Sequence, residues 1–257
     1  MDNEIRVHVP MVYYHVWDNK PYPLYNKRHY ESNDVIATIS KLTDEVVKAV
    51  APDIQSAYLP HAVNGEIFCK LPKSEVDRMR QESNIPDNKM VFFWNNRNAR
   101  RKQSGTLIFW FKEFLDKVGH DKATLLMHTE PRDPNGQDLG AIINDLNLHD
   151  GQVMISTQKV APEHLALIYN MVDCTINISD AEGFGLATLE SLSCETPIVV
   201  NMTGGLQEQV TDGENWFGFG LQPASKAVIG SLQVPYIYED RISQKDFTDA
   251  LKKALAL

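Results

Sequence analysis

Hydrophobic and polar positions alternate between strand-like and helix-like patterns over most of the chain. Short apolar runs at residues 90–94, 123–127, 153–156, 174–178 and 197–201 predict strands, and the segments between them, at residues 105–118, 137–146, 163–171 and 186–194, predict helices. In the first helix a repeat of three and four places Leu107, Phe111 and Phe114 on one face. Strands alternating with helices predict a parallel sheet with helices on both faces and right-handed crossovers. The expected fold class is therefore α/β, with a Rossmann-like doubly wound sheet.

The N-terminal part has a weaker pattern. Residues 7–16 alternate like a strand, residues 34–39 predict a short strand, and Ser40 caps a helix that runs to Val50. Prolines near both ends of residues 58–72, with no sustained period between them, predict a linker. We therefore assign residues 1–60 to a small α/β part, residues 61–72 to the linker and residues 73–257 to the main domain.

The C-terminal part is predicted with less regular structure. Residues 211–220 are polar and rich in glycine, which predicts a loop or hairpin. Residues 221–238 predict irregular structure with a short strand at residues 236–238. Ser243 then caps a last helix.

Composition limits the class of protein. The chain has 257 residues and 43% hydrophobic content, enough for a packed core. A formal charge of -9 argues against a general nucleic-acid binder, which needs a basic face. Three cysteines, two of them in segments predicted to be buried, favour a reducing compartment over a disulfide framework. No apolar run approaches the roughly 18 residues of a membrane span. We expect a cytoplasmic protein, with peripheral membrane association left open.

Two glycines mark the main candidate site. Gly183 and Gly185 follow the strand at residues 174–178 and precede the helix at residues 186–194. Glycine allows positive φ and close approach of a ligand, and the helix behind it presents free N–H groups and a positive dipole end. Such a turn is a natural phosphate site.

Glu182 and Glu190 bracket this turn. A carboxylate repels phosphate, so each glutamate should face a neutral, hydroxyl-rich group such as a sugar or a ribose. Glutamates eight residues apart also occur often on solvated faces, which is the alternative interpretation.

A basic loop follows the strand at residues 90–94. It holds four cations in six residues, namely Arg97, Arg100, Arg101 and Lys102. Arginine offers a bidentate fork and lysine a mobile point charge, which suits a diphosphate. An exposed basic loop or an RNA contact would have the same composition, but the position after a strand of the glycine-turn domain favours the diphosphate.

The string E-G-F-G-L-x-x-L-E at residues 182–190, with P-I-V-V at 197–200 and G-G-L-Q-E at 204–208, resembles the E-x7-E signature of retaining glycosyltransferases of GT-B fold, family 4. The resemblance covers roughly residues 34–255. It implies transfer of a sugar from a UDP-, GDP- or ADP-sugar donor to an acceptor hydroxyl, with retention at the anomeric carbon.

The resemblance also assigns the diphosphate contacts. Arg97 and Lys102 hold the spacing of the family's two cations, while Asn96 and Gln103 stand where the family usually has glycine. The donor is further expected to lie against the turn formed by Gly183, Phe184, Gly185, Leu186 and Ala187.

The two glutamates receive different roles. The resemblance implies that Glu190 holds the ribose hydroxyls and that Glu182 orients the donor sugar and stabilises an oxocarbenium ion, with a transient nucleophile as the alternative for Glu182. Charge on the leaving β-phosphate is then neutralised by protein donors. The mechanism that the resemblance implies then needs no metal or other cofactor, and the sequence agrees, since it has no D-x-D motif and no cluster of ligands at metal spacing.

The acceptor side is expected to be incomplete, because only about 60 residues precede the linker where a first domain usually has about 150. We expect a fragment of a longer enzyme or a subunit completed by another chain or copy. Three interpretations remain open: an enzyme, a nucleotide-sugar-binding module without activity, and an interaction protein that kept the fold. His61, at the start of the linker, fits either a catalytic base or a structural histidine.

Overall fold

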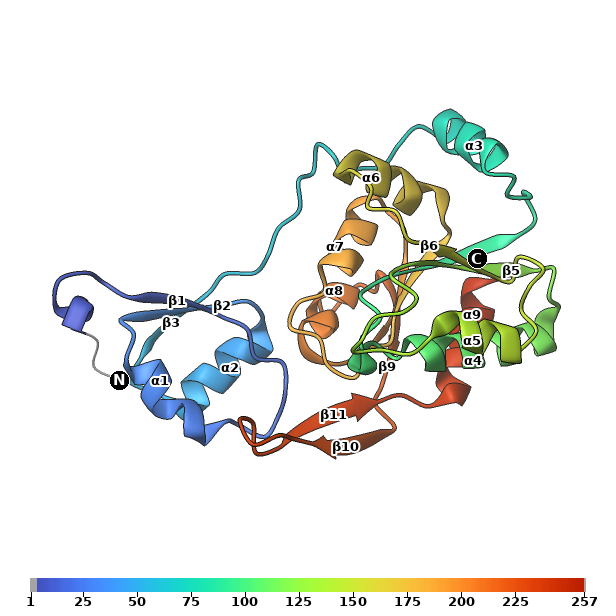
Figure 1. The fold of residues 1–257 in the computed structure, drawn as a ribbon. Coiled ribbons are helices and arrows are strands. Elements are labelled where there is room, and N and C mark those ends of the chain that lie inside the picture. Colours follow the sequence, from blue (N-terminus) through green and yellow to red (C-terminus); the bar gives the residue numbers. More distant parts are fainter. Residues whose placement is uncertain (1–3, 257) are drawn as a thin grey trace.

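The computed structural model describes residues 4–256 and contains two parallel sheets joined by residues 59–72, within which it assigns neither helix nor strand (Figure 1). The first sheet has the order β1 (Val12–His15), β2 (Val35–Thr38), β3 (Gln55–Tyr58). Helices α1 (Lys27–Glu31) and α2 (Lys41–Val50) pack against it, and Ser40 caps α2 by accepting the Thr43 N–H, as predicted. This part is the three-stranded unit.

The second sheet has six parallel strands in the order β6, β5, β4, β7, β8, β9. They are β4 (Met90–Asn95), β5 (Ala123–His128), β6 (Val153–Ser156), β7 (Cys174–Asn177), β8 (Ile198–Asn201) and β9 (Gly218–Leu221). The strand order reverses between β4 and β7, and ligands of such sheets bind at the carboxyl ends beside this reversal. The predicted α/β fold class with a doubly wound sheet is confirmed.

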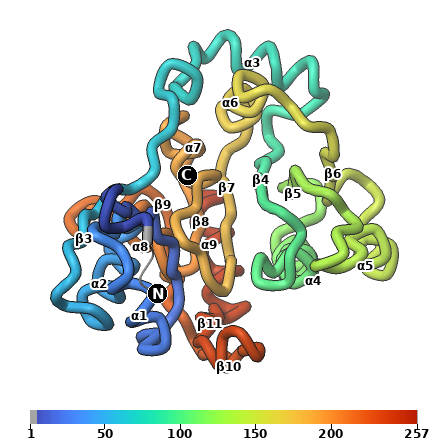
Figure 2. The backbone as a smooth tube through the Cα atoms, turned by 60° about the vertical axis from the view of Figure 1, so that its left-hand side comes forward, coloured from blue at the N-terminus to red at the C-terminus, as the bar shows by residue number. Residues whose placement is uncertain are grey.

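Helices cover both faces of this six-stranded unit (Figure 2). On one face are α4 (Ser104–Val118), α5 (Leu139–Asp145) and α9 (Gln244–Ala254), and on the other are α6 (Pro162–Met171), α7 (Leu186–Ser193) and α8 (Gln207–Val210). Phe92 packs towards the first group and Phe93 towards the second, because side chains alternate along a strand. A further helix, α3 (Lys73–Glu82), lies against α6. None of the helices within residues 4–256 has the length and apolarity to cross a membrane.

The region after β8 differs from the prediction. The prediction of a loop or hairpin at residues 211–220 is wrong at its C-terminal end, where β9 forms a parallel edge strand. The irregular structure expected at residues 221–238 is also wrong over most of this range, because β10 (Ser225–Ile229) and β11 (Ile237–Arg241) form an antiparallel hairpin. The short strand expected at residues 236–238 overlaps the start of β11. A Cβ at Gly218 would clash with the Ile198 carbonyl oxygen, so the pairing of β9 with β8 requires glycine at this position.

The three-stranded unit also departs from the prediction. The strand expected over residues 7–16 shortens to β1, and a 3-10 helix at Glu4–Val7 precedes it. Strand β3 and helix α1 were not predicted. The residues of β3 are mostly exposed, so no alternation of hydrophobic and polar positions marks it.

The two units contact each other near the carboxyl ends of β4 and β7. The Glu208 carboxylate of α8 accepts hydrogen bonds from the Lys41 N–H at 3.1 Å and from the Tyr58 hydroxyl at 2.9 Å. On β11, the Tyr238 N–H donates to the Lys20 carbonyl at 2.6 Å, and the Tyr238 carbonyl accepts from Asn19 Nδ2 at 2.8 Å. The hairpin and α8 therefore hold the three-stranded unit against the main domain.

Candidate functional site

A cavity of about 440 Å³ lies between the two units, at the carboxyl ends of β4 and β7. The three-stranded unit and the linker contribute one wall, and the residues after β4 and β7 contribute the others. The lining residues are Val16, Asp18, Ile39, His61, Asn95, Asn96, Arg101, Lys102, Glu182, Gly183, Phe184, Gly185, Leu186 and Ala187. The cavity thus brings together Lys102, Glu182 and the whole predicted glycine turn.

Glycines hold the turn in place. Gly185 has φ of +91°, and a Cβ there would lie 2.6 Å from Leu206 Cδ2, so the position requires glycine on two grounds. Helix α7 begins directly after it, and its first N–H groups have no partner within the helix. Gly204 packs on the carbonyl of Glu182, which also accepts the Gly205 N–H at 2.9 Å. The G-G pair therefore supports the turn from behind.

Lys102 and Glu182 form an ion pair inside the cavity. Their side chains are only 10% and 11% exposed, and burial lowers the pKa of Lys102 although the glutamate opposes this. Arg101 Nη1 lies 3.9 Å from the same Glu182 oxygen and donates to the Ala181 carbonyl. Two cations thus converge on one carboxylate beside the start of α7.

Gln103 preserves a glycine-like geometry in the basic loop. Its φ of +57° lies in the left-handed region, where the family that the sequence resembles usually has glycine. The side chain offsets this strain, because Nε2 donates to Asp180 Oδ2 at 2.5 Å and Oε1 accepts from the Thr106 hydroxyl. Gln103 therefore adopts a backbone conformation that glycine adopts readily, and its side chain is hydrogen-bonded on both sides.

Two polar lining residues, Asp18 and Asn96, fall outside the predicted site. Asp18 is a half-buried carboxylate of the three-stranded unit whose pKa is raised by burial, against the effect of Arg101. Asn96 has a buried Nδ2 without a hydrogen-bond partner in the described part of the chain, which leaves a donor free for a ligand. No pattern in the sequence marks Asp18, which belongs to the three-stranded unit, whereas Asn96 stands in the basic loop after β4 but is marked there only as a replacement of the family's glycine.

His61 lies at the cavity wall. Its Nδ1 is 3.1 Å from the Tyr14 hydroxyl, and its ring stands edge-on to Phe184 with the centroids 5.3 Å apart. This hydrogen bond with Tyr14 is the kind of contact expected if His61 is a structural histidine.

Arg97 lies away from the cavity. Its guanidinium donates to Asp133 at 2.6 and 3.1 Å and holds the pKa of that carboxyl down to about 2. The structure therefore brings Arg101 and Lys102 to the glycine turn, but not Arg97. The role expected for Arg97 at the diphosphate stays a prediction.

Glu190 lies behind one wall of the cavity. Its carboxylate accepts a hydrogen bond from the Tyr169 hydroxyl at 2.8 Å, and that hydroxyl accepts one from Asn95 Nδ2 at 2.9 Å. Burial raises the pKa of Glu190. Because Asn95 lines the cavity, the side chains of Tyr169 and Asn95 separate Glu190 from it along this hydrogen-bonded chain, and the contact of Glu190 with ribose stays a prediction.

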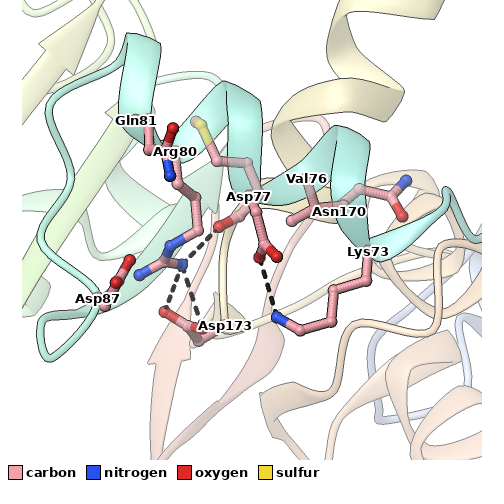
Figure 3. Close-up of a pocket in the computed structure, with 9 residues that line it drawn as sticks. Lys73, Val76, Asp77, Arg80, Gln81, Asp87, Asn170 and Asp173 are labelled. Carbon is pink, nitrogen blue, oxygen red and sulfur yellow. Dashed lines mark hydrogen bonds and ion pairs between the residues drawn. The ribbon is translucent and has the colours of Figure 1, made fainter.

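A second cleft, of about 500 Å³, lies between α3 and the start of β7 (Figure 3). Arg80 crosses it and donates to Asp173 and to the Met171 carbonyl, while Lys73 pairs with Asp77. Asp173 precedes β7, so this cleft is at the amino ends of the strands. Its cations are already paired and it faces away from the edge where doubly wound sheets bind ligands, so we do not assign it a ligand.

The fold is shared with solved glycosyltransferases. Sucrose-phosphate synthase from Thermosynechococcus elongatus superimposes with a TM-score of 0.70 at 22% identity, over 91% of this chain and 52% of that one. HepE from Anabaena, solved in complex with UDP and glucose, gives a TM-score of 0.67 at 20% identity, over 83% of this chain and 58% of that one. At such identities the likeness shows the fold alone.

Sequence comparison identifies the family. N-acetyl-alpha-D-glucosaminyl L-malate synthase from Bacillus anthracis is 23% identical over 190 residues, which cover 73% of this chain and 46% of the relative. The chain thus spans about half the length of the relatives it matches. Residues 75–254, more than half of the chain, match the family described as glycosyl transferases group 1. The chain belongs to this family of glycosyltransferases.

Proposed function

We propose that this chain binds a nucleoside diphosphate sugar in the cavity between the units and transfers the sugar to an acceptor hydroxyl with retention of configuration, as a family 4 enzyme. The observation that supports this best is the meeting of Lys102, Arg101 and the start of α7 around Glu182. Two cations beside a helix N-terminus suit a diphosphate. The UDP and glucose in the HepE complex are the kind of ligands that such a site would take.

Donor binding would exchange partners within the cavity. The diphosphate would replace Glu182 as the partner of Lys102 and Arg101, and it would accept hydrogen bonds from the free N–H groups of α7. Each charge-assisted hydrogen bond contributes about 1.5–3 kcal/mol. Glu182, released from Lys102, is then free to accept a hydroxyl of the donor sugar. When the bond to the sugar breaks, the same cations stabilise the charge on the β-phosphate.

The remaining roles follow from position. Glu190 would hold the ribose hydroxyls behind the Asn95 wall, and Arg97 would reach a phosphate only by leaving Asp133. The protein cations take the place of a metal ion in this scheme, so we propose metal-independent transfer. We also propose that the transfer takes place in the cytoplasm. The acceptor, whether sugar, lipid or protein, would enter beside the three-stranded unit.

A second function shares the donor site. A nucleotide-sugar-binding module or subunit that needs a partner chain would bind the nucleotide but show neither transfer nor donor hydrolysis. The small size of the three-stranded unit supports this second function, because within residues 4–256 the wall opposite the glycine turn comes from that unit and the linker alone.

Isothermal titration with UDP, GDP and ADP tests the donor site. We expect saturable binding of one nucleotide, weakened at least tenfold in Glu190→Ala, since a lost hydrogen bond to a charged group costs about 1.5–3 kcal/mol. Glu163→Ala is the matched control, because Glu163 is exposed on α6, the helix that contributes Tyr169. Equal binding by wild type and Glu190→Ala contradicts the ribose assignment, and no binding of any nucleotide contradicts the proposed function.

Glu182→Ala separates the two functions. Removal of this carboxylate frees Lys102 for the diphosphate, so we expect nucleotide binding to persist. Transfer and donor hydrolysis, followed as release of free nucleotide, should disappear. A wild-type chain that binds nucleotide but releases none from any donor sugar is the outcome expected of the module.

A further inference from the structure

A buried carboxylate outside the cavity contacts the basic loop. Glu239, on β11, is 1% exposed and accepts two hydrogen bonds from Arg100, at 2.9 Å from Nη1 and 2.6 Å from Nη2. Arg241 Nη2 lies 3.9 Å from the same carboxylate. A carboxylate so far from water needs such partners, and a bidentate guanidinium fixes both distance and orientation.

Arg100 begins the 3-10 turn that carries the cavity cations. The turn covers Arg100–Lys102, so the residue held by Glu239 directly precedes Arg101 and Lys102. Three consecutive cations repel one another and would spread into solvent unless each is held. Glu239 holds the first of them, and Glu182 faces the other two. Both ends of the turn are therefore fixed.

The hairpin that carries Glu239 is tied to the glycine turn. The Asp180 N–H donates to the Arg101 carbonyl at 2.8 Å, and the Asp180 carbonyl accepts the Asp240 N–H at 2.9 Å. Asn201 Nδ2 donates to the Asp240 carbonyl at 2.8 Å. In Figure 1 the hairpin lies beside the base of the main domain and reaches the three-stranded unit. Glu239 thus acts from a strand whose own place is set by the residues around the cavity.

We infer that Glu239 is a positioning residue of the diphosphate site, acting through Arg100 to present Arg101 and Lys102 to the β-phosphate; this rests on the proposed function. Glu239 does not line the cavity, so we expect it to have no direct contact with the donor. Its effect should fall on the part of the donor that the two cations hold. Cations kept in place before the ligand arrives bind it without first being ordered.

Glu239→Gln removes the charge and keeps the volume. The matched control is Lys226→Gln, which breaks an ion pair of 3.6 Å between Lys226 and Asp240 across the same hairpin. A second test variant, Arg100→Lys, keeps the cation and loses the bidentate fork. Because the Arg100 side chain is half exposed, the lysine of this variant stays in contact with water. The variant can therefore replace Glu239→Gln in the test if Glu239→Gln folds poorly.

The first measurement compares two nucleotides. The probes are whichever of UDP, GDP and ADP binds the wild type and the corresponding monophosphate, which lacks the β-phosphate. In Glu239→Gln the affinity for the diphosphate should fall about tenfold, or about 1.4 kcal/mol, while that for the monophosphate changes less than about twofold. Arg100→Lys should show the same selective loss at about threefold, and Lys226→Gln should show none.

The second measurement needs no nucleotide. Hydrogen exchange of the amides at residues 98–104 should be faster in Glu239→Gln than in wild type and unchanged in Lys226→Gln, because the anchor of the turn is lost. An equal loss of affinity for both nucleotides, or exchange rates unchanged at residues 98–104, overturns the inference. Wild type that binds the diphosphate while Glu239→Gln and Arg100→Lys bind it equally well overturns the inference alone. Wild type that binds no nucleotide overturns the proposed function and the inference together.

Discussion

The two sheets of this chain differ in how completely they are covered. In the six-stranded unit both Phe92 and Phe93 are fully buried, because helices pack on either face. In the three-stranded unit the described helices pack on one face, and Val12 and Tyr14 on the other are 64% and 40% exposed. Parallel sheets are normally covered on both faces, so the three-stranded unit is the less buried scaffold.

Both units nevertheless contribute to one cavity. The six-stranded unit provides the glycine turn and the paired cations, all anchored to its core. The three-stranded unit provides Val16, Asp18 and Ile39, on a scaffold with less buried apolar surface. Local stability follows such burial, so the wall opposite the glycine turn should open more easily. We therefore expect nucleotide binding to depend on the larger unit and transfer to depend on both.

The largest expected effect tests the core of the six-stranded unit. Phe111→Ala should lower the free energy of unfolding by about 3–5 kcal/mol, because this ring is fully buried between α4 and the sheet and packs on Phe92 and Phe114. Urea unfolding measures the change. The matched control is Phe109→Ala on the same helix, where the ring is 47% exposed and the change should stay within about 0.5 kcal/mol.

This pair also tests the comparison between the units. Hydrogen exchange in Phe111→Ala should accelerate in β4 and β5 more than in β2, if the two sheets have separate cores. Equal acceleration in all three strands would show that the sheets unfold as one cooperative body and that the difference in burial has no consequence for local stability.

The alternation of strands and helices made the six-stranded unit predictable. Each of its inner strands is a short apolar run, and Leu107, Phe111 and Phe114 give α4 one apolar face. Of the hairpin of β10 and β11 the sequence predicts only a short strand at the start of β11, and the rest was missed because tertiary contacts fix it. Glu239 is a buried charged residue paired with Arg100, which is distant in sequence, and Tyr238 pairs with the backbone of Lys20. No local pattern encodes either contact.

The candidate site shows the same division. Lys102, Glu182 and the glycine turn, which lie together at the cavity, could be named from the sequence because each stands in a motif of fixed spacing. Arg101 was not singled out among four neighbouring cations, since only the 3-10 turn decides which of them point inward. Asp18 enters the cavity from a different unit, and its neighbours there are distant in sequence.

The next effect contrasts one carboxylate from each unit. Burial raises the pKa of Asp180 in the six-stranded unit to about 6, above its value of 3.8 in an unfolded chain. The folded state therefore keeps a proton that the unfolded state releases, and the free energy of unfolding falls as pH rises from about 4 to 6. At about 1.4 kcal/mol per pKa unit the loss is about 3 kcal/mol. Asp180→Asn should be more stable than wild type by about this amount at pH 7 and equal to it below pH 4.

Asp34 in the three-stranded unit should behave in the opposite way. The Met11 N–H and Arg6 lower its pKa, so ionised Asp34 stabilises the fold and this contribution disappears as pH falls below its unfolded value. Asp34→Asn should therefore lose most stability at neutral pH. Unfolding of both variants between pH 3 and 7 checks the two signs, and an Asp180→Asn protein that is less stable than wild type at pH 7 contradicts the first.

The smallest effect tests the division of work at the cavity. Asp18→Asn removes the carboxylate that the three-stranded unit directs at Arg101 and Lys102. Because that carboxylate competes with a phosphate for the cations, nucleotide affinity should stay within about twofold of wild type or rise slightly. Donor turnover, measured as release of free nucleotide, should fall about fivefold, or about 1 kcal/mol, if Asp18 orients a hydroxyl during transfer. Asp53→Asn, at an exposed site of the same unit, is the control and should change neither quantity.

The sign of the change in affinity matters more than its size. If Asp18→Asn lowers nucleotide affinity about tenfold, the three-stranded unit helps to bind the nucleotide, and burial does not separate the roles of the two units. If affinity holds while turnover falls, the weakly covered unit acts on transfer alone. That outcome would agree with a wall that closes on a donor already held by the larger unit, because the cations and the glycine turn need nothing from Asp18 to bind a diphosphate.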